Sequence, residues 1–210
     1  MLAVFIASTL ASPQTLPTDV CSPHGFQPGY FPADANLEGA GLFTAFLRAM
    51  QEPSLLELAK KPHTVSYRFT WFYPFAMPVA VRLNVRADGT AQLFTKVFSN
   101  KAKVVDSKAL VFDPCTALNI NEIGEVPAVE AAKFTELIKK TAFWSLSMVE
   151  PHPDVLDGDL WAIEGVRDGV YHVVIRRIPQ PSGYTEIGRY LAKTLAKLDD
   201  SVIVIPEFRH

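Results

Sequence analysis

Apolar and polar residues alternate within the stretch from His63 to Phe72, without interruption from Thr64 to Trp71. Such alternation places every second side chain on the same face and is typical of an antiparallel strand that buries one face only. We therefore predict a half-buried strand over this stretch. Its apolar side consists of Val65, Tyr67, Phe69 and Trp71, and its polar side of Thr64, Ser66, Arg68 and Thr70.

Two further pairs of apolar runs are each joined by an Asp-Gly dipeptide, at Asp88-Gly89 and at Asp168-Gly169. Asp-Gly between apolar runs is a strong hairpin signal, and two turns fit it. One is a two-residue type I′ loop, and the other is a type I turn whose glycine forms a G1 bulge. The two turns differ by one residue in register, and such a slip moves every side chain of one strand to the other face.

The side-chain pattern favours the bulge in both hairpins. In the hairpin over 79–98, the bulge gathers Val81, Leu83, Val85, Ala91 and Leu93 on one face. In the hairpin over 157–177, it gathers Trp161, Ile163, Gly165, Tyr171, Val173 and Ile175. This second register also predicts that Glu164 lies directly opposite His172, that Val166 lies opposite Val170, and that Arg176 lies across from Leu160.

Apolar residues recur at helical spacing in three other stretches, 42–50, 127–141 and 185–198. Ser54 and Glu57 have the spacing of a capping box, which predicts a short helix over 55–61. A further strand is expected within 104–112, and the apolar run 202–205 suggests an edge strand. Strands that follow one another, with helices between groups of strands, predict an α+β fold. We expect a single domain over 41–210, an antiparallel β-sheet built from hairpins with helices packed on one face.

The first 40 residues differ from the rest of the chain. Met1 to Ala11 is apolar and resembles the central region of a signal peptide, although the basic residues that usually precede it are missing. This segment is too short to cross a bilayer as a helix. We expect export to the periplasm or secretion, and the alternative is a buried N-terminal strand or helix. Residues 12–40 are rich in Pro and Gly and predict an irregular arm.

Composition narrows the function classes. The chain has 210 residues, 49% of them hydrophobic, and a formal net charge of −2, so no basic surplus indicates nucleic-acid binding. No transmembrane segment, cofactor motif or zinc-type Cys/His cluster is expected. The two cysteines, Cys21 and Cys115, could form a disulfide if the chain is exported, or could be buried free thiols.

The predicted hairpin supplies the candidate chemistry. Glu164 and His172 could act as a general acid and base, with Arg176 beside them to bind an anion. Trp161 and Tyr171 on the same hairpin are further binding candidates. The alternative is an ordinary cross-strand ion pair, which would contribute at most about 1 kcal/mol to stability.

Two other stretches carry weaker candidates. The acidic loop contains Glu150, His152, Asp154, Asp157 and Asp159, which could ligate a metal but lack EF-hand spacing and more simply form a solvated loop. The aromatic run 71–77 could line a ligand pocket or pack in the core.

The C-terminal third resembles a group of uncharacterised exported bacterial proteins. The shared pattern is Phe-Trp, then Asp-Gly-x-x-Trp-x-x-Glu-Gly, then Gly-x-Tyr-His and an Arg. The matching residues are Phe143, Trp144, Asp157, Gly158, Trp161, Glu164, Gly165, Gly169, Tyr171, His172 and Arg176. The resemblance implies export and no particular activity.

Three functions follow as hypotheses. The leading one is a secreted or periplasmic non-catalytic domain that binds a ligand or a protein partner, because no complete catalytic set is visible. The alternatives are a hydrolase-like enzyme that uses Glu164 and His172, and an inhibitor or accessory protein that acts through its sheet face.

Overall fold

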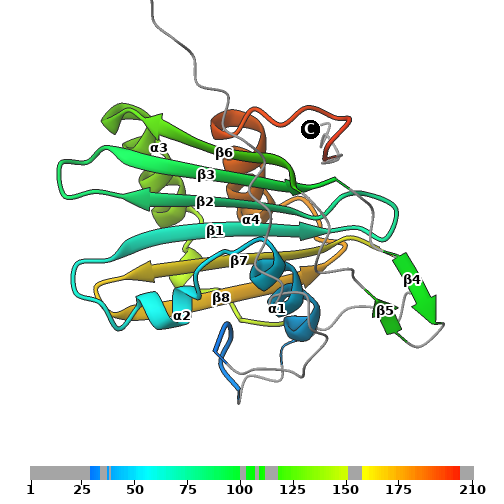
Figure 1. Ribbon diagram of the computed structural model, residues 1–210. Coiled ribbons are helices and arrows are strands. Elements are labelled where there is room, and N and C mark those ends of the chain that lie inside the picture. The colour runs from blue at the N-terminus through cyan, green and yellow to red at the C-terminus, as the bar shows by residue number, and fades with distance from the viewer. Residues whose placement is uncertain are drawn as a thin grey trace, which may run out of the picture.

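A six-stranded antiparallel sheet separates two layers of helices, with strand order β6-β3-β2-β1-β7-β8 (Figure 1). The computed structural model describes residues 29–33, 37, 39–99, 103–106, 109–111, 118–150 and 158–203. The six strands are β1 (Val65–Phe72), β2 (Val79–Val85), β3 (Ala91–Phe98), β6 (Leu118–Val126), β7 (Leu160–Arg167) and β8 (Val170–Arg177). The helices are α1 (Ala40–Ala49), α2 (Leu55–Leu58), α3 (Ala128–Lys140) and α4 (Gly183–Arg189).

The fold class is α+β, as the order of elements predicted, but helices cover both faces of the sheet and not one. In Figure 1, α3 and α4 lie behind the sheet, whereas α1 and α2 lie in front of it. Helix α1 covers the second face because that face is also apolar at one end of the sheet. The ring of Phe46 lies 5.2 Å from that of Phe72 and 6.4 Å from that of Phe98, centroid to centroid.

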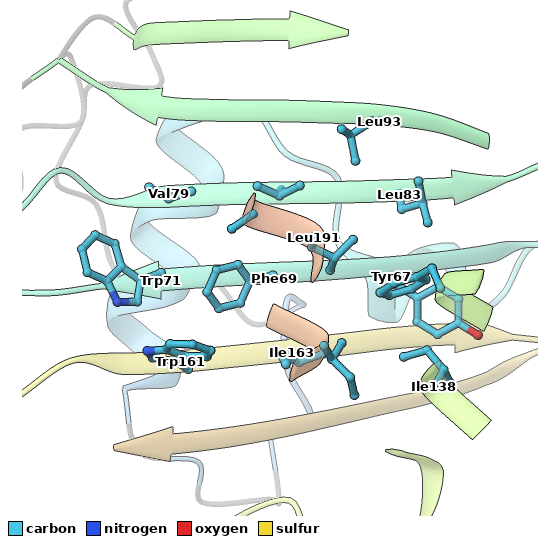
Figure 2. Close-up of a cluster of buried hydrophobic side chains, with 14 of the residues drawn as sticks. Tyr67, Phe69, Trp71, Val79, Leu83, Leu93, Ile138, Trp161, Ile163 and Leu191 are labelled. Carbon is cyan, nitrogen blue, oxygen red and sulfur yellow. The ribbon is translucent and has the colours of Figure 1, made fainter. Parts of the chain in front are cut away.

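The larger core lies between the sheet and the α3 and α4 layer (Figure 2). Tyr67, Phe69 and Trp71 of β1 all point into it, which confirms the predicted apolar side, but the polar side of β1 is also buried, so the prediction of a half-buried strand is wrong. Trp161 and Ile163 of β7 share this face. Ile138 from α3 and Leu191 from η3 (Tyr190–Leu195), the turn of π-helix that continues α4, cover the core on the side away from the sheet.

The β2–β3 hairpin has the predicted G1 bulge. Val85 pairs with Ala91, and Gly89 has a φ of 82°. The amide of Gly89 donates to the carbonyl of Arg86 at 3.0 Å, and the amide of Arg86 donates to the carbonyl of Thr90 at 2.8 Å. These two hydrogen bonds close a type I turn with its glycine in the left-handed conformation.

The β7–β8 hairpin has the other turn, so its predicted register is wrong. Arg167 pairs with Val170, and both loop residues have positive φ, 52° at Asp168 and 82° at Gly169, as a type I′ turn requires. The prediction assumed that one face must be wholly apolar while the other meets water. Here both faces are buried. A charged residue is therefore tolerated on either face, provided that a group of opposite charge lies beside it.

The remaining elements follow the sequence in part. Ser54 caps α2 by accepting the amide of Glu57, and Ser182 caps α4 in a capping box with Thr185. The expected strand within 104–112 is instead two short strands, β4 (Lys103–Asp106) and β5 (Ala109–Val111), in a separate sheet. Strand β6 was not predicted, and residues 202–203 form no strand. No helix in the described ranges is both long and apolar enough to cross a membrane.

Candidate functional site

The observed register separates the predicted acid and base. Glu164 lies opposite Val173, and His172 lies opposite Gly165, so the two side chains belong to opposite faces of the sheet. Glu164 faces the α1 layer, where it is fully buried. The structure therefore does not form a Glu164–His172 pair, and the acid–base hypothesis loses its geometric basis.

Glu164 is instead bound to Arg68, its direct neighbour on β1. The Arg68 Nε donates to Glu164 Oε2 at 2.7 Å, and Nη2 donates to Oε1 at 2.8 Å. Both side chains have 0% of their surface exposed. The Tyr171 hydroxyl from β8 donates to the same Oε1 at 3.0 Å. Two parallel charge-assisted bonds of this kind are among the stronger hydrogen bonds in proteins.

A second carboxylate, Glu52, joins Arg68 to two more cations of the sheet. Arg82 on β2 donates its Nε to Glu52 Oε2 at 2.7 Å, and Lys96 Nζ on β3 lies 3.0 Å from Oε1. Arg68 Nη1 is 3.7 Å from Oε2. We refer to these five residues, Glu52, Arg68, Arg82, Lys96 and Glu164, as the ionic cluster.

The ionic cluster also forms hydrogen bonds with the backbone of residues 50–53, which follow α1. Arg68 Nη1 donates to the carbonyl of Pro53 at 2.7 Å, and Lys96 Nζ donates to that of Met50 at 2.7 Å. The Tyr30 hydroxyl donates to the carbonyl of Glu52 at 2.6 Å. Buried carbonyl groups need such donors, since an unpaired polar group in the interior is costly.

Burial and charge oppose each other at the two carboxylates. Burial raises the pKa of Glu164, and the Arg68 guanidinium offsets this only in part. Burial also raises the pKa of Glu52, but Arg82, Arg68 and Lys96 together outweigh it and leave that pKa below its ordinary value. With both carboxylates ionised, as their close contacts with cations indicate, the cluster holds three positive and two negative charges.

His172 occupies an aromatic site on the opposite face. Its ring packs edge-on against Phe143 at 5.1 Å and tilted against Trp144 at 6.2 Å. Burial lowers the pKa of His172, and the carbonyl groups of Leu146 and Phe143 oppose that effect. His172 Nε2 is buried without a hydrogen-bond partner in the described structure, as are Trp144 Nε1 and Tyr67 Oη. The site is a packed hydrophobic contact with few accessible polar atoms.

Arg176 and Trp161 also have structural partners. Arg176 donates Nη2 to the carbonyl of Ser147 and to Glu150, each at 2.8 Å, and so holds the 145–150 segment against the edge of β8. The Trp161 indole donates to Asp159 at 2.5 Å, and the Trp71 indole donates to the same oxygen at 3.4 Å. Glu150 and Asp159, the two carboxylates of the predicted acidic loop that the structure describes, therefore both accept hydrogen bonds within the fold.

Several predicted features lie outside the described residues. They are Met1–Ala11, Cys21 and Cys115, and the loop residues His152, Asp154 and Asp157. Within the described ranges, no group of three or more His, Cys, Asp or Glu side chains is arranged to hold a metal ion.

Arginines in the middle of two strands are the feature of the sequence that points to the ionic cluster. Arg82 stands in the middle of a strand, VAVRLNV, whose other face is buried, and Arg68 stands at the centre of β1. A charged side chain at mid-strand needs a buried partner once a helix covers its face. Their partners Glu52 and Glu164 could not be identified, because nothing in a single sequence pairs such distant positions.

The sheet is less covered at β3 and β6. Ile123 of β6 pairs with Phe94 of β3 and has 64% of its surface exposed. The Arg82 guanidinium carbon lies 3.9 Å from the centre of the Phe94 ring, on the same face. Strand β6 is the last strand of the sheet, and no described segment pairs with its outer edge.

Comparison with known proteins places no constraint on the function: no protein-family model and no curated protein sequence matches the chain.

Proposed function

We propose that this chain is an exported, non-catalytic domain that binds a protein partner along the outer edge of β6, with which no described segment pairs. The observation that carries the proposal is an edge strand whose central apolar residue, Ile123, is 64% exposed. An unpaired edge presents a row of backbone N–H and C=O groups to which an extended peptide can add as a further strand. Export is supported by the apolar segment Met1–Ala11 and by the resemblance in the C-terminal third.

Recognition by strand addition would use both backbone and side chains. The backbone of the peptide would supply affinity, and every second side chain of the peptide would lie on the face of Ile123 and beside it. An apolar residue exposed on an edge strand favours association of that edge with another chain. The polar residues beside Ile123, among them Glu122 and Glu125, would keep the unbound edge from pairing indiscriminately.

The enzyme hypothesis has less support. Its proposed pair, Glu164 and His172, is divided between the two faces of the sheet. Glu164 is held by Arg68 and Tyr171, and a guanidinium does not release a proton at physiological pH. An inhibitor or accessory protein would use the same β6 edge and remains a special case of partner binding.

A peptide selection tests the proposal with two matched variants. Peptides displayed on phage would be selected against the full chain and then measured against Ile123→Asp and Val129→Asp. Val129 on α3 is 66% exposed, so both variants place a charge at an equally exposed apolar position. We expect selected peptides to bind Ile123→Asp about tenfold more weakly or worse, since a carboxylate opposes apolar contact. They should bind Val129→Asp as they bind the wild type.

Hydrogen exchange shows whether such a peptide adds as a strand. A bound peptide should slow exchange of backbone amides within 118–126 and leave those of 170–177 unchanged. Failure to select any peptide, or selected peptides that bind Ile123→Asp normally, would contradict the proposal. Export is tested separately by the intact mass of protein from its native host, where a retained Met1 would contradict it.

A further inference from the structure

The ionic cluster has more positive than negative charge. Glu164 is bound by Arg68, and Glu52 is shared by Arg82, Lys96 and Arg68. Three cations therefore face two carboxylates. A charge held out of water is costly unless it is paired, so the additional positive charge favours a further anion at an accessible member of the cluster.

Two members of the cluster are partly exposed, Lys96 with 12% and Arg82 with 7% of the side chain, and Arg82 has donors that no described residue uses. Its Nε is bound to Glu52, but Nη1 and Nη2 form no hydrogen bond with any described residue. The side chain is only 7% exposed, yet these two nitrogens are not among the buried atoms that lack a partner. The small exposed part of Arg82 therefore includes the two terminal nitrogens, which meet solvent.

Lys96 offers a different geometry. Its Nζ lies 3.0 Å from Glu52 Oε1 and donates to the carbonyl of Met50 at 2.7 Å and to that of Gln51 at 3.3 Å. An ammonium lacks the planar pair of parallel N–H donors that a guanidinium presents to a carboxylate. Arg68 is fully buried and donates to Glu164 and Pro53.

The Arg82 guanidinium is held in place before any ligand arrives. Glu52 fixes one edge of the guanidinium, and the Phe94 ring lies 3.9 Å from its central carbon. A side chain that is already ordered loses little conformational entropy on binding. Its outer edge presents two nearly parallel N–H groups, which match the two oxygens of a carboxylate.

We infer that Arg82 is a binding site for a carboxylate ligand whose apolar part lies over Phe94 and Ile123. The pairing of Phe94 with Ile123 places this apolar surface next to the guanidinium on one face. Glu125, a carboxylate of the neighbouring strand, is already paired with Arg86 through two contacts of 2.5 and 2.8 Å. The ligand class is an aromatic or aliphatic carboxylate, and the site stands without strand addition at β6.

Benzoate is a suitable probe, because it joins a carboxylate to a flat apolar ring. Isotope-labelled full-length protein would be titrated with sodium benzoate at constant ionic strength and followed by NMR. We expect saturable shifts of the Arg82 Nε–H signal and of the Arg82 and Phe94 amides. Arg82→Lys keeps the charge but lacks the two parallel donors, and should weaken binding about tenfold. Arg86→Lys, on the exposed end of the same hairpin, should change nothing.

Three outcomes of the benzoate titration would each overturn the inference, and two further tests follow them. One is a titration that does not saturate, and another is an equal response to sodium chloride. The third is binding to Arg82→Lys as strong as to the wild type. If that variant does not fold, the wild type alone decides: nuclear Overhauser contacts between benzoate protons and the Phe94 ring must appear. Their absence at saturation would place the ligand elsewhere. Inorganic phosphate in place of benzoate shows whether the apolar ring contributes, and binding as tight as benzoate's would contradict the assigned class.

Discussion

The missing side chain of Gly165 allows two aromatic rings to lie against the sheet. A Cβ at this position would lie 2.7 Å from Phe143 Cε1, 3.2 Å from Trp144 Cη2 and 3.3 Å from Tyr67 Cδ1. In the bulged register Tyr171 would lie across from Gly165, but in the observed register Gly165 lies opposite His172 and Tyr171 is on the other face.

We predict that Gly165→Ala destabilises the protein by about 1–3 kcal/mol, because the backbone or the rings must move to admit the methyl group. Gly124→Ala is the matched control, since a Cβ at Gly124 in β6 meets no atom within 4 Å. Urea unfolding followed by tryptophan fluorescence measures both. Equal stability of the two variants would show that the rings near Gly165 repack without cost.

Replacing Glu164 by Gln tests the buried half of the ionic cluster. The change leaves the Arg68 guanidinium in the interior with Glu52, 3.7 Å away, as its nearest carboxylate. Removing one partner of a buried ion pair costs about 3–5 kcal/mol, and we expect a loss of that order in the free energy of unfolding. Glu125→Gln breaks an exposed pair with Arg86 and should have little effect. If both variants lost a similar amount of free energy of unfolding, burial could not be the reason for the effect of Glu164→Gln.

At the scale of elements, two Asp-Gly turns of similar sequence adopt different geometries. The amphipathic pattern identified the bulge between β2 and β3, because the face beyond that turn is partly open to water. The same argument failed between β7 and β8, where α1 and Tyr30 cover the second face. The period-2 pattern of a strand indicates register only when the solvent side is known, and that side depends on elements far away in the sequence.

The two turns should respond differently to glycine. Asp168 has a φ of 52°, a conformation that glycine adopts without strain, so Asp168→Gly should stay within about 0.5 kcal/mol of the wild type. Asp88 instead accepts hydrogen bonds from the Thr90 amide at 2.9 Å and hydroxyl at 2.7 Å. Asp88→Gly removes these two hydrogen bonds and raises the conformational entropy of the unfolded chain. Its unfolding midpoint in urea should therefore fall clearly. The reverse order of stability would contradict the assigned turn types.

Strand β6 is an element that the pattern of apolar and polar residues does not predict. Its sequence, LNINEIGEV, mixes polar residues and a glycine with four apolar side chains, and most of its residues are exposed. Such a strand exists because β3 offers a partner along its whole length. Helices α1 and α3 were predicted correctly, because each places an apolar stripe on the sheet and the stripe is visible in the sequence alone.

At the scale of the whole molecule, His172 couples stability to pH. Burial lowers the pKa of His172 in the folded protein below its ordinary value of 6.5, so the unfolded chain binds a proton more readily. The free energy of unfolding should therefore decrease as the pH falls from about 6.5 toward that lowered value. In His172→Gln this decrease should be smaller over the same interval. Urea unfolding at a series of pH values measures it, and parallel curves for the two proteins would refute the role of His172.

The strand order also determines how the chain reaches this structure. Strands β1, β2 and β3 are consecutive, and so are β7 and β8, but the two groups meet only where β1 pairs with β7. That pairing joins residues as far apart as Arg68 and Glu164, 96 positions along the chain. Closing so long a loop is entropically unfavourable, so we expect the two hairpins to form first and β1–β7 docking to limit the refolding rate. In pulse-labelled refolding, amides between β2 and β3 should become protected before those between β1 and β7.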